Sequence, residues 1–101
     1  MIYSLTDKLN FNDNPVIKIK DKKIVVQADA ETVLSLVDAL QEKGEMQATL
    51  EAADLLFTEK DKKIIKSLKL GFQDYMTLIS TAISLALGED PDKEENTQGE
   101  A

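Results

Sequence analysis

Two short runs near the N-terminus combine apolar and charged residues in a strand-like pattern. In residues 16–20 isoleucines alternate with lysines, and residues 23–27 are rich in β-branched side chains. Alternation with a period of two predicts strands that have one apolar and one solvated face. Asp21 and Lys22 lie between the runs, so we expect a β-hairpin over residues 16–27 with its bend at these two residues. Two strands alone are marginally stable, and helices must therefore cover the apolar face.

Beyond the hairpin, apolar residues recur at the spacing of an α-helix. Asp29 is a good N-cap, Gly44 is expected to stop the first helix, and Gly88 to stop the last one. Thr58 precedes the third helix, and Asp61 three residues on makes a pair that resembles a capping box. We expect four helices, at about residues 30–42, 45–56, 59–69 and 73–87.

The fold class that follows is α+β, with an N-terminal β-hairpin packed on about four short α-helices. In the second helix the expected inward stripe is Met46, Leu50, Ala53 and Phe57. The periodicity as a whole predicts a core that contains Ile17, Ile19, Val33, Val37, Leu40, Leu50, Leu56, Ile64, Leu68, Phe72, Ile79 and Ile83.

The two ends of the chain differ from its middle. We expect residues 1–88 to form a single folded domain and residues 89–101 to be an acidic, disordered tail. The tail holds six acidic residues and one lysine, a net charge of −5 out of −7 for the whole chain. Residues 1–15 fit either a short helix or part of a strand, followed by a turn cluster rich in asparagine. The tail is interpreted either as a solubilising end, or as a functional linker or one of two alternative C-termini of the gene.

The chain contains no Cys, no His and no Arg. It therefore has no thiolate nucleophile, no imidazole base, no zinc–sulfur site and no guanidinium fork. Scattered carboxylates at Glu45, Glu51, Asp54 and Asp61 show no acid–base pairing and fit exposed helix faces. Asn10, Asn12, Asp13 and Asn14 lack the spacing of a calcium loop and are expected to form a turn. We therefore expect no enzymatic activity, no metal and no cofactor.

The charge pattern also bears on partners. An acidic chain is repelled by nucleic acid and anionic lipid. Lys62, Lys63 and Lys66 of the third helix are expected to point into solvent, and the fourth helix lacks side chains that read bases. No run is long and apolar enough to span a bilayer or to act as a signal peptide. We expect a cytoplasmic protein that binds neither nucleic acid nor membrane.

The fourth helix is unusually apolar. At 100° per residue its apolar side chains cover an arc of about 200°, wider than the stripe of an ordinary surface helix. One interpretation is a central helix covered by its own chain, and the other is a helix partly covered by another chain; the two are compatible. The candidate residues for contact with a second copy or a partner helix are Phe72, Tyr75, Met76, Ile79, Ile83 and Leu87.

Three segments together suggest a family. They are Phe57–Asp61, Leu68–Tyr75, and an apolar helix that closes at Ala86–Asp90. With the strands before them and the acidic tail after them, they resemble small tail assembly chaperones of long-tailed bacteriophages that infect Gram-positive hosts. The resemblance covers about residues 16–92 and rests on general pattern, because these proteins carry no catalytic signature.

The resemblance implies a non-enzymatic protein of the host cytoplasm. Such a chaperone coats the tape-measure protein, keeps its long apolar helices soluble and assists polymerisation of the tail tube. Self-association and a longer form made by a translational frameshift are also implied. The alternatives are a small structural virion component, such as a tail or connector protein, and another helical protein-interaction module.

Overall fold

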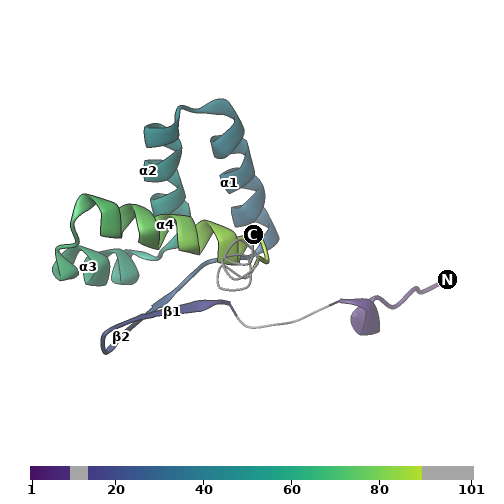
Figure 1. The fold of residues 1–101 in the computed structure, drawn as a ribbon. Coiled ribbons are helices and arrows are strands. Elements are labelled where there is room, and N and C mark those ends of the chain that lie inside the picture. Colours follow the sequence, from purple (N-terminus) through teal and green to yellow (C-terminus); the bar gives the residue numbers. More distant parts are fainter. Residues whose placement is uncertain (10–13, 90–101) are drawn as a thin grey trace, which may run out of the picture.

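The computed structural model describes residues 1–9 and 14–89. A two-stranded antiparallel hairpin, β1 (Val16–Ile19) and β2 (Lys22–Val25), lies against four helices (Figure 1). The helices are α1 (Ala30–Glu42), α2 (Glu45–Leu56), α3 (Glu59–Leu68) and α4 (Phe72–Ala86). A short 3₁₀ turn, η1 (Thr6–Lys8), precedes them. The α+β prediction, with its hairpin and four helices, is confirmed. The acidic tail beyond Glu89 and the turn residues Asn10, Asn12 and Asp13 lie outside the described residues.

The hairpin bends one residue earlier than predicted. Ile19 pairs with Lys22, so the bend consists of Lys20 and Asp21 and not of Asp21 and Lys22. Lys20 has a φ of +55°, a left-handed conformation that few residues other than glycine adopt readily. Because no glycine or asparagine marks this bend, the sequence alone did not fix its position.

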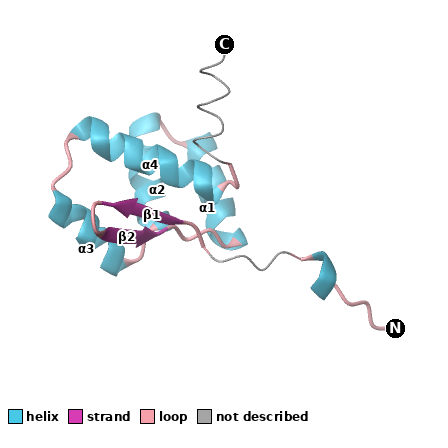
Figure 2. Ribbon diagram, turned by 60° about the horizontal axis from the view of Figure 1, so that its bottom comes forward, coloured by secondary structure: helices cyan, strands magenta, loops and turns pink. Residues whose placement is uncertain are grey.

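The hairpin lies over the helices (Figure 2), and its isoleucines pack into their core. Ile17 pairs with Ile24, so their side chains lie on one face of the sheet. Ile24 and Val26 are fully buried, whereas Ile17 and Ile19 are half-buried. After β2 the chain is joined to the helices by a backbone hydrogen bond of 2.8 Å from Gln27 N–H to the Leu56 carbonyl.

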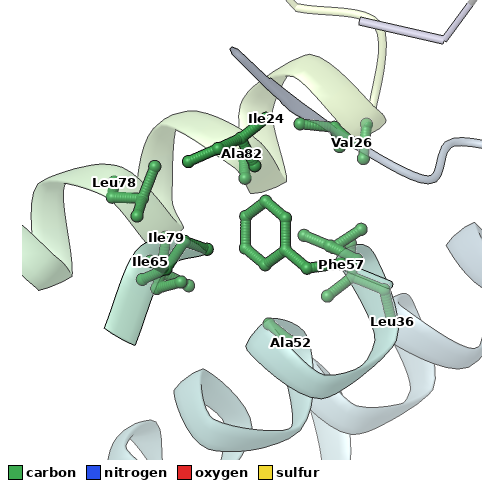
Figure 3. Close-up of a cluster of buried hydrophobic side chains, with 11 residues drawn as sticks. Ile24, Val26, Leu36, Ala52, Phe57, Ile65, Leu78, Ile79 and Ala82 are labelled. Carbon is green, nitrogen blue, oxygen red and sulfur yellow. The ribbon is translucent and has the colours of Figure 1, made fainter. Parts of the chain in front are cut away.

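The core gathers around Phe57, directly after α2. Its ring is 3% exposed and lies among side chains from β2, α1, α2, α3 and α4 (Figure 3). Around it lie the other buried members of this cluster: Ile24, Val26, Leu36, Ala52, Leu56, Ile65, Leu78, Ile79, Ala82 and Ala86.

The predicted core is confirmed in part: Leu56 and Ile79 are buried, seven of the twelve predicted residues are half-buried, and three are exposed. Leu40, Leu50 and Phe72 are 39%, 56% and 64% exposed. In α2 the buried face consists of Ala48, Thr49, Ala52 and Leu56. Of the expected stripe, Phe57 is buried and Ala53 half-buried, but Met46 and Leu50 are exposed. Small side chains let α2 lie close to both α1 and α4. Hydrophobicity alone does not show that small residues are needed on this face.

A side chain caps the N-terminus of α1, whereas α2 begins at a glycine without a side-chain cap. Asp29 accepts a hydrogen bond of 3.2 Å from Thr32 N–H and one of 2.7 Å from the Thr32 hydroxyl. These bonds lower the pKa of the Asp29 carboxyl. The first helix ends at Glu42, as predicted, with Lys43 as its C-cap. Gly44, which was expected to stop it, is the N-cap of α2 in an extended conformation with a φ of −64°.

The ends of α3 and α4 fall one residue before the predicted ones. Lys69 ends α3 in a left-handed conformation, with φ and ψ both 50°. Gly88 has a φ of +85° and donates to the Leu85 carbonyl, while Glu89 N–H donates to the Ser84 carbonyl. This pair of bonds is a Schellman motif, so the prediction that Gly88 stops α4 is confirmed.

The left-handed Lys69 yields a stability prediction. Lys69→Gly is expected to raise the free energy of unfolding by roughly 0.5–1 kcal/mol, because glycine has no Cβ to clash at positive φ. Lys66→Gly is the matched control. Lys66 lies inside α3, where glycine costs about 1 kcal/mol. Urea denaturation followed by circular dichroism measures both changes, and equal losses in the two variants would contradict the left-handed cap.

Candidate protein-interaction groove

An open groove of about 430 Å³ lies between α2 and α3. Each helix region contributes four residues at the spacing i, i+3, i+4 and i+7, which places them on one helix face. From α2 and the residue after it these are Leu50, Ala53, Asp54 and Phe57; from α3 and its cap they are Lys62, Ile65, Lys66 and Lys69. Leu70 and Tyr75, on either side of the α3–α4 turn, complete the lining.

The floor of the groove is apolar. Phe57 and Ile65 are buried, and Ala53, Leu70 and Tyr75 are half-buried. Leu50 stands exposed at the rim, and Met46 is exposed one helical turn before it. The groove is therefore shaped to receive apolar side chains and not a small polar substrate.

Lysines dominate the rim of the groove. Lys62 Nζ donates to Asp54 and, at 3.0 Å, to Glu59. These bonds, the one to Asp54 above all, raise the pKa of the Lys62 ammonium. Within residues 1–9 and 14–89, Lys66 and Lys69 make no ion pair. Three lysines against one aspartate give the lining a positive balance, which favours a partner with an acidic edge.

The α4 candidates differ in how far the protein's own chain covers them. Ile79 is 1% exposed and belongs to the chain's own core, so it is unavailable to a partner and is withdrawn as a contact residue. Met76 and Ile83 are half-buried, and Leu87 is exposed at the far end of a helix that is about 22 Å long. Tyr75 lines the groove, and Phe72, one helical turn before it, is exposed.

Sequence reasoning missed most of the groove. It placed Leu50 in the core and treated Lys62 and Lys66 as solvent-facing lysines. The available signal was the shared i, i+3, i+4, i+7 spacing on two consecutive helices. That spacing becomes a groove only once the angle between α2 and α3 is known.

Other candidate chemistry is limited. In the described part of the chain, no three Asp or Glu side chains gather in a way that could hold a metal ion. Asn14 uses its side-chain carbonyl to accept from Ala28 N–H at 3.4 Å. None of the helices that the structure describes is both long and apolar enough to cross a membrane.

Asp61 has a structural role that its neighbours in sequence do not suggest. It is 6% exposed and accepts a 3.0 Å hydrogen bond from Val25 N–H of β2. Its own N–H donates to the Thr58 hydroxyl at 3.3 Å, so the Thr58 half of the predicted capping box is confirmed. The expectation that Asp61 lies on an exposed face is wrong, because its carboxylate joins α3 to the hairpin.

Comparison with family models, curated proteins and solved structures gave no match.

Proposed function

We propose that the protein is a non-enzymatic assembly chaperone that holds an amphipathic helix of a long helical partner in the α2–α3 groove. A tape-measure protein of a phage tail is such a partner, and tail-tube assembly in the cytoplasm of an infected cell is the process served. The observation that carries the proposal is an open, apolar-floored groove with unpaired lysines at one rim in the described part of the chain.

Helix-in-groove binding fits the shape and the chemistry of this site. A partner helix would place apolar residues at i, i+3 or i+4 and i+7 over the Phe57 and Ile65 floor. Each large aliphatic side chain that is buried contributes roughly 1.5–3 kcal/mol before the ordering costs of binding. An acidic flank on the partner would lie along Lys66 and Lys69.

The titratable groups of the groove support a binding role and not catalysis. The carboxylate of Asp54 is engaged by Lys62, and the raised pKa of Lys62 keeps its ammonium protonated and unable to act as a base. Tyr75 carries the one hydroxyl of this lining, and the one carboxylate of the lining, Asp54, is already bonded to Lys62.

Binding of designed peptides tests the groove. A fluorescent amphipathic helix with leucine anchors and a glutamate flank is expected to bind, and a scrambled peptide of the same composition is not. Lys66→Glu with Lys69→Glu should weaken binding roughly 3- to 30-fold, because two charge pairs become repulsive. The matched control is Lys60→Glu with Lys63→Glu, the same charge change on exposed α3 residues outside the lining. Equal weakening by both pairs would overturn the groove as the site.

The biological partner needs a separate test. Co-expression with fragments of a tape-measure protein should keep those fragments soluble, and the Lys66→Glu, Lys69→Glu variant should fail to do so while remaining folded. Purified virions should lack the protein. Its presence as a stoichiometric component of finished particles would instead support the small structural virion protein and overturn the chaperone.

A further inference from the structure

The N-terminal arm, residues 1–9, exposes an unusual amount of apolar surface. Met1, Ile2, Tyr3, Leu5 and Leu9 are each at least 48% exposed. In both ribbon views the arm leads away from the body of the chain (Figure 1, Figure 2). Five exposed large apolar residues in nine are unfavourable in water, so this arm is a candidate for contact with another surface.

The outer edge of β1 is open in the described part of the chain. Val26 N–H donates to the Pro15 carbonyl at 2.8 Å, and bonded pairs alternate along an antiparallel ladder. Val16 and Lys18 therefore direct their N–H and C=O groups away from β2. No other backbone bond of the described residues reaches them. On β2 one of the outward groups, Val25 N–H, is already bonded to Asp61.

A second groove of about 390 Å³ runs beside this edge, between β1 and α4. Ile17, Ile19, Leu70 and Leu78 supply its apolar lining, with threonines of α4 at positions 77 and 81. Lys20 and Asp74 also line it, one cation and one anion. Only Leu70 belongs to both grooves, so this surface is separate from the proposed helix-binding site.

We propose that the N-terminal arm of a second copy of the chain adds as a strand to the open edge of β1 and places its apolar side chains in the β1–α4 groove. Strand addition satisfies the outward backbone groups of Val16 and Lys18. In an extended arm, alternate residues Met1, Tyr3 and Leu5 share one face and enter the groove together.

Charge and stoichiometry both favour a second copy as the occupant. The arm carries Asp7 and Lys8 beside its apolar residues, and the groove offers Lys20 and Asp74 as partners of opposite sign. Each chain has one arm and one such edge, so two chains related by a two-fold axis fill both. The arm of the same chain points away from its own β1 in both views.

Removing the arm tests the pairing. Light scattering at about 100 µM should give twice the chain mass for the full chain and the single-chain mass after deletion of residues 1–9. Because none of these residues is buried, the truncated chain should keep its circular dichroism and its melting temperature. Leu5→Asp should act like the deletion, whereas Thr6→Asp, beside it in the arm, serves as a matched control with little effect. A full chain that is monomeric at this concentration, or a truncated chain with the mass of the full chain, would overturn the proposal.

Mixed labelling identifies where the arm binds. The chain has no cysteine, so Ser4→Cys gives one site for a nitroxide spin label. The spin-labelled chain, made at natural isotopic abundance, is mixed with ¹⁵N-labelled full chain that carries no spin label. Amide signals of residues 16–19, 77 and 81 in the ¹⁵N chain are then expected to broaden. In a second sample, the spin label and ¹⁵N are on the same chain, which is diluted in unlabelled protein. If the signals broaden only in this second sample, the arm binds its own body and the second copy is excluded. Broadening elsewhere excludes the β1 edge.

Discussion

Replacing Phe57 with alanine is expected to lower the free energy of unfolding by about 3–5 kcal/mol, the largest loss from any single truncation that we anticipate. The ring contacts the buried cluster where β2 and all four helices meet (Figure 3). Its removal leaves a cavity that these elements cannot close without losing their other contacts. A small domain has about 5–15 kcal/mol of stability in total, so the variant should be close to unfolding at 37 °C.

Phe72→Ala is the matched control for Phe57→Ala. It is the same chemical change at an exposed ring, and it should alter the free energy of unfolding by less than about 0.5 kcal/mol. Urea denaturation followed by circular dichroism measures both variants. Similar losses at the two positions would mean that Phe57 is not the centre of the core.

Asp61→Ala is expected to lower the free energy of unfolding by about 1.5–3 kcal/mol. The carboxylate accepts from Val25 N–H in a buried position, and its loss leaves that backbone donor without a partner. Alanine at this position should also loosen the packing of α3 on β2, which the carboxylate bridges.

Two further variants separate this effect from a general loss of charge. Asp61→Asn keeps a carbonyl oxygen that can accept from Val25, so it should lose less stability than Asp61→Ala. Asp54→Ala removes an exposed carboxylate and should cost no more than about 1 kcal/mol. Amide hydrogen exchange gives a direct measure, because the Val25 amide should exchange faster in Asp61→Ala. Unchanged protection of this amide would contradict the bridge.

Local signals in the sequence were sufficient for most of the architecture. Asp29 as an N-cap, Thr58 before α3 and Gly88 after α4 are each decided by a few neighbouring residues, and the structure confirms them. The isoleucine–lysine alternation in β1 likewise depends on nothing distant. Such features are predictable because their energy comes from the same short stretch of chain that displays the pattern.

Features that depend on packing between elements were not predictable. Leu50 and Ala52 both lie in a helical apolar pattern, but the closeness of α1 and α4 selects the alanine for the interior. Asp61 could be buried only because β2 presents Val25 N–H to it. Ile79 could not be recognised as a core residue for the same reason, since the packing of the other elements on α4 buries it. The groove between α2 and α3 likewise depends on how these helices pack.

The bond from Val25 to Asp61 also limits how this protein can aggregate. A β-ribbon grows into a fibre when both of its edges can recruit a new strand. Here α3 packs against β2, and its Asp61 carboxylate occupies Val25 N–H, one of the donors that an incoming strand on that edge would need. Strand pairing between molecules is therefore favoured at β1 and disfavoured at the edge of β2. The hairpin can act as a connector of finite assemblies while remaining a poor seed for fibrils.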